Sequence, residues 1–479
     1  MKKYKSKFLF ILTFVLISAG SFSQNADFQR IDAKQKSYEL AVVWKEASYN
    51  FANMNNCKGL DMDSLYRAFV PVVENTENDY EYYKEMQRFL AHFNNGHTYC
   101  QMPDYLYEYI AFPLLHTKYE NGKVLIENMG SHYSANVKIG DEILTINDLP
   151  ALEYFQKYEI PYVSMSNEKA KIHGVMFGYS HGAMALRSDN KKLKLRIKKG
   201  EQTENIEIPY DRYIAPLPED TALQNQQHYI NEFYSTQYKN SFAVDSVKNF
   251  AYIHLTECNE EFHTFFAEKY DEIMKYGNLI LDISDNSGGG SSYTDIALHC
   301  LADKDSIKWI SYKARINNSL YKAKAGSRIY YMNDSLVAQE VKDFYYPYYY
   351  NNAYEDIASD PYINPIADSL RYKGNVYVII NHNTASAAEF FALMLSQNAN
   401  VKYFGEQTAG ALAQPLPVFL PSGLRVFINT CKTFDFQGND VSSGFVPNCE
   451  YDFSDFYKTD NPNEILQKLI KVIKENSTQ

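Results

Sequence analysis

The sequence predicts a multidomain α/β protein, and three observations support this. Residues 30–100 repeat apolar side chains at the three- and four-residue spacing of helices, residues 105–210 contain alternating strand patterns, and residues 245–475 alternate strand and helix. The last pattern is typical of parallel sheets covered by helices. A length of 479 residues suits about three domains. We expect a helical N-terminal domain at 24–104, a β-rich module at 105–212 and an α/β core at 213–479.

The first 23 residues have the pattern of a secretory signal peptide. A basic start (Lys2, Lys3, Lys5 and Lys7) precedes the apolar run 8–17 and the small residues Ser21 and Ser23. An uncleaved anchor helix would need nearer 20 apolar residues. We expect cleavage before Gln24 and a periplasmic or secreted protein without stable membrane insertion, since no later segment is long and apolar enough to span a bilayer. No Cys follows the site, which disfavours a lipid anchor.

Charge and cysteine content exclude several classes of protein. The net charge is 47 − 58 = −11, so a broad electrostatic grip on nucleic acid is not expected. Six cysteines in an exported chain permit disulfides, whose pairing the sequence does not give. No Cys-x-x-Cys occurs, so neither a redox motif nor a cysteine zinc site is indicated.

Each region resolves into predicted elements. In the N-terminal region, helices are expected near 40–51, 63–73 and 80–93, ahead of the loop Asn94-Asn95-Gly96-His97-Thr98. The β-rich region has strands near 123–127, 142–146, 193–197 and 205–208, with turns at Gly140 and Gly200, whereas 165–190 is hard to place. The core has strands at 250–255, 279–283, 376–380 and 401–404, helices at 260–274, from about 292, at 386–396 and at 463–474, and a hairpin at 416–435 turning at Pro421-Ser422-Gly423.

Ser386 lies where a predicted strand meets a helix, among the small residues of Thr384-Ala385-Ser386-Ala387-Ala388-Glu389. A sharp turn there exposes a nucleophile, and the Ala387 N–H at the helix start can hold an oxyanion. The alternative is an ordinary N-cap serine, because Glu389 three residues on completes a capping box.

Ser287-Gly288-Gly289-Gly290 follows a buried strand, and its glycines let the backbone approach a ligand closely. A plain turn and a phosphate site are the alternatives. No Lys-Ser or Lys-Thr follows, so it is not a P-loop.

A serine nucleophile needs a base, and two histidines are candidates. His97 follows Gly96 in a loop between two predicted domains, and His382 precedes Ser386 by four residues. A lone histidine is more often structural than functional. A carboxylate would orient the imidazole.

Together these segments resemble the tail-specific (C-terminal processing) and tricorn-type serine peptidases. Residues 137–147 resemble the Gly-Asp strand of a PDZ domain, 279–289 and 383–389 the strand and nucleophile segments, 405–410 the Gly-x-x-Thr-x-Gly loop, and 444–448 a Gly-hydrophobic-x-Pro-Asp motif with Asn448 in place of Asp. The resemblance implies a PDZ-like domain at 105–212, a ClpP/crotonase-like core with parallel strands and Ser386 as the nucleophile.

One departure concerns the base. The tail-specific branch has a lysine just after the Gly-x-x-Thr-x-Gly loop, where this sequence has Ala411, and the nearest lysine is Lys402. The tricorn-like branch takes a histidine from an Asp-Gly-His-Thr segment before its PDZ domain, which Asn95-Gly96-His97-Thr98 resembles. The resemblance therefore implies His97 as the base. It also implies a carboxylate near the C-terminal motif, with Asp440 the best match and Asp435 the second.

The sequence thus predicts an exported serine endopeptidase that acts on peptides or unfolded proteins. Ser386 is the expected nucleophile, His97 the base, Asp440 the orienting carboxylate, and the N–H groups of Ala387 with Gly288 or Gly289 the oxyanion hole. No metal or organic cofactor is implied, and the oligomeric state is not indicated. The alternative is an inactive binding protein for peptides or hydrophobic ligands, which the 42 tyrosines and the changes at Asn95, Ala411 and Asn448 would suit. A glycoside hydrolase is disfavoured, since no distinctive carboxylate pair occurs.

Overall fold

The structure is a computed structural model that describes twelve stretches of the chain. They are residues 31–54, 57–176, 185–186, 191–212, 239–300, 306–307, 311–314, 319–331, 336–349, 362–412, 414–459 and 461–476. The predicted signal peptide, with its cleavage site before Gln24, lies outside these residues.

Three helices at the start of the described chain confirm the helical prediction: α1 (Ala33–Asn50), α2 (Met62–Glu74) and α3 (Asp79–Ala91). Each begins at a side chain that accepts a backbone N–H, namely Asp32, Asp61 and Asn78, which satisfies one free donor of the first turn.

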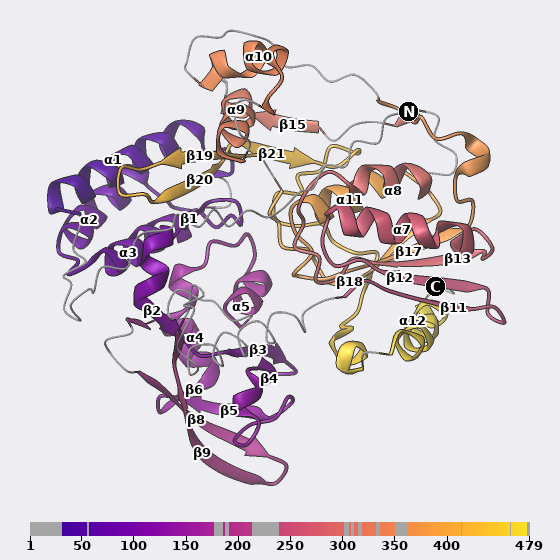
Figure 1. The fold of residues 1–479 in the computed structure, drawn as a ribbon, viewed down its shortest axis with the longest axis horizontal. Helices are drawn as coiled ribbons and strands as arrows, with labels where there is room; N and C mark the ends of the chain where they lie inside the picture. Colours follow the sequence, from indigo (N-terminus) through magenta and orange to yellow (C-terminus); the bar gives the residue numbers. More distant parts are fainter. Residues whose placement is uncertain are drawn as a thin grey trace.

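These helices share their core with a hairpin from far along the sequence. β19 (Pro415–Phe419) and β20 (Arg425–Asn429) form the predicted hairpin, and β1 (Tyr99–Gln101) pairs antiparallel with β20. The indigo helices and the yellow hairpin lie side by side in Figure 1. The buried Glu39 carboxylate on α1 accepts the Ser422 N–H and hydroxyl at the hairpin turn, at 2.7 and 2.6 Å.

A second region is an antiparallel sheet with the order β3-β4-β5-β8-β9. Its strands are β3 (Leu115–Glu120), β4 (Lys123–Met129), β5 (Glu142–Ile146), β8 (Lys192–Lys199) and β9 (Gln202–Pro209), with β6 (Leu149–Pro150) beside β5. The turns at Gly140 and Gly200 have the positive φ angles, 90° and 61°, that glycine adopts readily. Helices α4 (Ala151–Tyr158) and α5 (Glu168–Met176) accompany this sheet, and α5 occupies part of the stretch that was hard to place.

The third region is a six-stranded sheet with the order β11-β12-β13-β17-β18-β22, parallel except for the antiparallel pair β11–β12. Its strands are β11 (Ser241–Asp245), β12 (Phe250–His254), β13 (Asn278–Asp282), β17 (Asn375–Ile380), β18 (Val401–Gly405) and β22 (Cys449–Glu450). This confirms the predicted α/β alternation. Because all of β12, β13, β17 and β18 run the same way, their carboxyl ends meet along one edge of the sheet.

Helices cover both faces of this sheet (Figure 1). α7 (Glu260–Ile273), α8 (Tyr293–Cys300) and α11 (Ala387–Leu395) cover one face, and α12 (Pro462–Asn476) covers the other. Side chains of β13 alternate between them: Leu279 and Leu281 pack with the first group and Ile280 with α12. The sheet is therefore buried on both faces and gives its carboxyl edge a rigid support.

The remaining elements are short or lie at the periphery. They are η2 (Asp104–Tyr109), β2 (Ile110–Phe112), η3 (Ser131–Tyr133), η4 (Ile160–Tyr162), β7 (Ala185–Leu186), β10 (Asp211–Arg212), β14 (Ser306–Ile307), β15 (Ser311–Ala314), α9 (Ser319–Tyr331), α10 (Gln339–Tyr349), β16 (Tyr362–Ile363), η7 (Asp368–Leu370), β21 (Cys431–Phe434) and η8 (Ser454–Lys458).

The cysteines correct one expectation. All six are free thiols, and five of them are buried. Burial raises the pKa of Cys258 and Cys300 to about 12, so these thiols stay protonated and unreactive at neutral pH. They pack as small apolar side chains in a core of this size, which needs no covalent staples.

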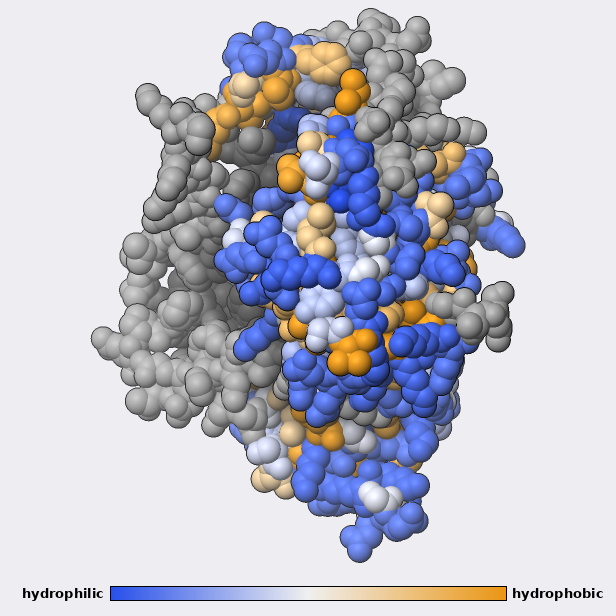
Figure 2. Space-filling model, turned by 90° about the vertical axis from the view of Figure 1, so that its right-hand side faces the viewer, coloured by the Kyte–Doolittle hydropathy of each residue, from blue (hydrophilic) through white to orange (hydrophobic). Residues whose placement is uncertain are grey.

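The surface in Figure 2 is mainly hydrophilic where its residues are coloured, and hydrophobic residues there form small separate groups. Among the described residues, no helix combines the length and apolarity needed to cross a membrane.

Candidate active site

Ser386 occupies a strained turn between β17 and α11. Its φ and ψ angles are 54° and −118°, a conformation that side chains with a Cβ seldom adopt and that marks functional sites. The residue is the N-cap of α11, as its sequence neighbours predicted. Within the described chain, no hydrogen bond engages the Ala387 N–H, so the first amide of the helix remains open beside the serine.

The glycine loop after β13 packs directly on this turn. A Cβ placed on Gly288 would lie 2.7 Å from Ser386 Cβ and 2.8 Å from the Ala387 nitrogen. Only glycine therefore leaves that amide accessible. The Gly288 N–H itself donates to Asn286 Oδ1 at 3.0 Å, whereas no hydrogen bond among the described residues uses the Gly289 N–H. Of the two glycines predicted as donors, Gly289 is thus the open one and Gly288 provides the clearance.

Glu389 links the Ser386 turn to a second loop. Its carboxylate accepts the Ser386 N–H at 3.1 Å, which is the predicted half of the capping box. It also accepts the Thr408 hydroxyl at 2.5 Å and the N–H groups of Gly410 and Ala411 at 2.9 and 2.8 Å. Burial raises the pKa of Glu389 to about 7, although the four hydrogen bonds favour the ionised form and lower the pKa. A single buried carboxylate therefore holds the nucleophile turn and residues 408–411 together.

The loop that carries His97 rests on residue 411. A Cβ placed on Gly96 would lie 2.9 Å from Ala411 Cβ, and the Ala411 N–H binds the carboxylate that also holds Ser386. The His97 N–H donates to Asn95 Oδ1 at 3.0 Å, which fixes the backbone of the loop. The structure thus brings the loop of the predicted base against Ala411, whose N–H is bound by the carboxylate that holds the Ser386 turn.

The predicted third group, Asp440, lies between β21 and the 444–448 motif. Its carboxylate accepts the Ser442 N–H at 3.0 Å and pairs with Lys432 at 3.4 Å. Burial raises the pKa of Asp440, but these partners outweigh burial and hold the pKa below its ordinary value. The second candidate, Asp435, is occupied in a turn, where it accepts the N–H groups of Gln437 and Asn439.

Asn448, a departure from the family motif, has a clear structural use. Its side-chain oxygen accepts the Tyr403 N–H of β18 at 2.8 Å. An aspartate oxygen would serve the same purpose, so this change does not bear on activity.

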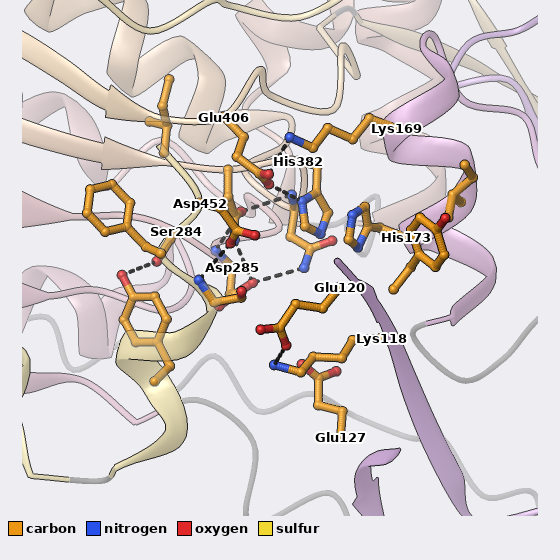
Figure 3. Close-up of a pocket in the computed structure, with 18 of the residues that line it drawn as sticks. Lys118, Glu120, Glu127, Lys169, His173, Ser284, Asp285, His382, Glu406 and Asp452 are labelled. Atoms are coloured by element: carbon orange, nitrogen blue, oxygen red, sulfur yellow. Dashed lines mark hydrogen bonds and ion pairs between the residues drawn. The ribbon is translucent and has the colours of Figure 1, made fainter. Parts of the chain in front are cut away.

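A cavity of about 520 Å³ lies at the carboxyl edge of the parallel sheet, between that edge, β3 and α5. Ser386 and His97 do not line it, whereas the competing histidine His382 does. Figure 3 shows His382 beside Glu406, with Lys169 and His173 reaching in from α5. The His382 Nδ1 is 2.5 Å from Glu406 Oε2, and the His173 ring stacks on it at 3.4 Å between centroids. His382 is therefore committed to a contact between two regions of the molecule.

Several groups around this cavity have shifted pKa values. Burial, helped by the Asp285 charge, raises the pKa of Glu127 to about 7. Burial and the neighbouring His382 lower the pKa of His173 to about 3. Burial also raises the pKa of Glu406, but the hydrogen bond and charge of His382, together with Lys169, lower it to about 2. No group of three or more His, Cys, Asp or Glu among the described residues is arranged to hold a metal ion.

Part of the chain matches a known protein family. Residues 249–451 match the model of peptidase family S41. The matched residues include the Ser386 turn and the parallel strands β12, β13, β17 and β18. The match indicates a serine-type peptidase. A comparison with curated protein sequences finds no match.

The fold of the chain is similar to solved structures of CPAF. Mature CPAF complexed with lactacystin is 14% identical, with a TM-score of 0.66 over 93% of this chain and 98% of that one. Mature CPAF alone is 15% identical, with a TM-score of 0.63 over 87% and 92% of the two chains. At this identity the likeness shows a shared fold, and it extends well beyond the matched family region.

Two parts of the site were not identified from sequence. Glu389 was assigned only as a capping residue, and the sequence holds no local signal that it also binds residues 408–411. Residues 164–167, which contact both loops of the site, lie at the edge of the stretch that was hard to place. Their sequence, Ser164-Met165-Ser166-Asn167, carries no motif that indicates these contacts.

Proposed function

We propose that the chain is an endopeptidase that cleaves peptides or unfolded proteins by a Ser386 nucleophile and a His97 base. The observation that carries the proposal is the strained Ser386 turn with an open Ala387 amide, joined through Glu389 to the segment on which the His97 loop rests. A mere N-cap serine needs no positive φ, because N-caps ordinarily have extended backbone.

In this mechanism the Ser386 hydroxyl attacks the scissile carbonyl carbon while His97 accepts its proton. The oxyanion binds to the N–H groups of Ala387 and Gly289, and losing one such donor typically costs about 3–4 kcal/mol of transition-state stabilisation. His97 then passes the proton to the leaving amine. Water, deprotonated by His97, finally releases the acyl group from Ser386.

The decisive experiment is active-site labelling with a fluorophosphonate, which reacts with activated serines. We expect Ser386→Ala to abolish both labelling and the hydrolysis of a fluorescent casein, with His97→Gln strongly reducing both. Labelling that survives Ser386→Ala contradicts the assignment. A folded protein that neither labels nor cleaves supports the inactive binding protein instead.

Asp440 is proposed as the carboxylate that orients His97. Since the neutral amide of Asp440→Asn cannot stabilise the imidazolium, we expect kcat to fall by about two orders of magnitude or more. Asp435→Asn is the matched control, because it removes the same charge from a neighbouring turn. Equal activity of the two variants would remove Asp440 from the mechanism.

The segment before Gln24 is proposed to direct export to the periplasm or the medium. N-terminal sequencing of the protein recovered from those fractions should begin at Gln24.

Residues 105–212 are proposed as a PDZ-like module, a role that the edge strand β3 and the glycine turn before β5 support. A peptide with a free C-terminus should then bind more tightly than its amidated form.

A further inference from the structure

Residues 164–167 contact both loops of the proposed active site. The segment leads from η4 into α5, outside the matched family region of 249–451. One end of it touches the loop of the base, and the other end touches the loop that holds the nucleophile turn. The segment therefore connects two loops that are distant in sequence.

Ser164 acts on the base loop. Its hydroxyl accepts the Asn95 N–H at 3.2 Å and lies 2.9 Å from the Asn95 carbonyl, to which it donates. Asn95 in turn accepts the His97 N–H on its side chain at 3.0 Å. Both Ser164 and Asn95 are buried, so these bonds are shielded from competing water. The backbone of His97 is thus one residue removed from Ser164.

Ser166 and Asn167 act on the other loop. The Ser166 hydroxyl donates to the Gly410 carbonyl at 2.6 Å. The Asn167 side-chain NH₂ donates to the carbonyls of Thr408 and Ser443, each at 3.2 Å. Thr408 and Gly410 are the residues whose hydroxyl and N–H clamp Glu389, which holds the Ser386 N–H. Three hydrogen bonds in sequence therefore connect Asn167 to Ser386, through Thr408 and Glu389.

The same Asn167 also starts α5. Its side-chain oxygen accepts the Ala170 N–H at 2.9 Å, as an N-cap does. The helix then carries Lys169 and His173 to Glu406 and His382, on the segments that flank the nucleophile. The two ends of the Asn167 amide thus have separate tasks: the oxygen caps a helix, and the nitrogen binds the active-site loop.

We infer that residues 164–167 set the alignment of His97 with Ser386, with Ser164, Ser166 and Asn167 as positioning residues. The inference rests on the proposed function. It predicts that loosening this segment slows the reaction at each active serine while leaving the fold and the number of active serines unchanged.

Asn167→Asp separates the two tasks of the side chain. Aspartate caps helices as well as asparagine, so α5 keeps its start, but an oxygen replaces the nitrogen that faces two carbonyl oxygens. We expect kcat for casein to fall at least tenfold with KM within twofold of wild type. Asn461→Asp is the matched control: it adds the same charge at the start of α12, where Asn461 accepts the Asn463 N–H, and should keep full activity.

The readout that separates positioning from simple damage is fluorophosphonate labelling followed over time and over pH 5–9. The final labelled fraction counts competent serines, and the rate reports the reactivity of each. We expect Asn167→Asp to label to the wild-type extent but at least ten times more slowly. We also expect the labelling rate of this variant to fall less steeply than that of the wild type as the pH is lowered toward 5. A normal rate with a reduced labelled fraction would show a structural role and overturn the inference.

Ser166→Ala provides a second test that adds no charge. It removes only the hydrogen bond to Gly410, and we expect a threefold to tenfold slower labelling rate. Wild-type rates in both variants would overturn the inference and leave the proposed function intact. Absence of labelling in the wild type would instead contradict the proposed function.

Discussion

Gly96 faces Ala411 so closely that a Cβ on the glycine would lie 2.9 Å from the alanine Cβ. In the tail-specific enzymes that this chain resembles, a lysine base occupies the position of Ala411. Here the short side chain leaves room for the loop of His97. Both residues are small, so the loop of His97 packs directly against Ala411.

This contact predicts a compensating pair of substitutions. Gly96→Ala should lower kcat/KM about tenfold to a hundredfold, because the new methyl group pushes the His97 loop away and misplacement of about 1 Å is enough for such losses. Ala411→Gly removes the opposing methyl group, so the double variant should recover to within about threefold of Ala411→Gly alone. A double-mutant cycle on kcat/KM measures this coupling. Simple additivity of the two effects would contradict the contact.

A side chain at position 288 should reduce activity through steric overlap with the Ser386 turn rather than through backbone strain. Gly288→Ala should reduce kcat by about 10²–10³-fold, because its Cβ would meet Ser386 Cβ and cover the Ala387 amide. Gly438 is the matched control, with a φ of 91° against 97° at Gly288 and open space around its Cα. Gly438→Ala should lose about 1 kcal/mol of unfolding free energy and no activity. Equal activity losses in both variants would point to strain alone.

Glu389→Gln should destabilise the protein and slow the labelling of Ser386. All four partners of this carboxylate donate hydrogen bonds to it. In glutamine, an NH₂ group replaces one of the two oxygens, and this group cannot accept the hydrogen bonds that the replaced oxygen accepted. We expect a loss of about 1–3 kcal/mol in the free energy of unfolding by urea. Glu81→Gln is the control, because Glu81 accepts the Glu77 N–H at an exposed helix start, and a change within about 0.5 kcal/mol is expected.

His173 predicts a pH-dependent contribution to stability. Its pKa is lowered to about 3 in the folded protein, so the unfolded chain binds a proton near pH 6.5 that the folded chain does not. Stability from this group is present above pH 6.5 and lost as the pH falls toward 3. His173→Gln removes that loss, so the wild type should lose about 2 kcal/mol relative to the variant between pH 6.5 and 4.5. Urea unfolding at both pH values measures the difference, and parallel curves would contradict it.

The sequence predicted most elements of the fold because their signals are local. The strand at 279–283 and the helix after Ser386 follow from apolar runs, caps and turn residues, and the structure has both within a residue or two. The hairpin at 416–435 was predicted as a hairpin, but its pairing with β1 was not, because a pairing partner far along the chain leaves no local pattern.

The candidate site divides in the same way. Ser386 and Ala387 were predicted from the strand–helix junction. His97 was a candidate from its loop and was preferred to His382 because of the family resemblance, which alone suggested Asp440. The second task of Glu389 and the contacts of Ser166 and Asn167 depend on loops that meet only in the folded molecule. The sequence left disulfide pairing open, and the structure has free cysteines, since buried thiols in a large apolar core need no partner.

The pairing of β1 with β20 has a consequence for how the molecule is made. β1 begins two residues after His97, and the Thr98 hydroxyl accepts the Asn429 N–H at 3.1 Å. The loop of the base therefore cannot take its final place until the ribosome has added about nine-tenths of the chain. A nascent chain thus emerges without a competent centre, and synthesis itself delays the onset of proteolysis until the molecule is almost complete.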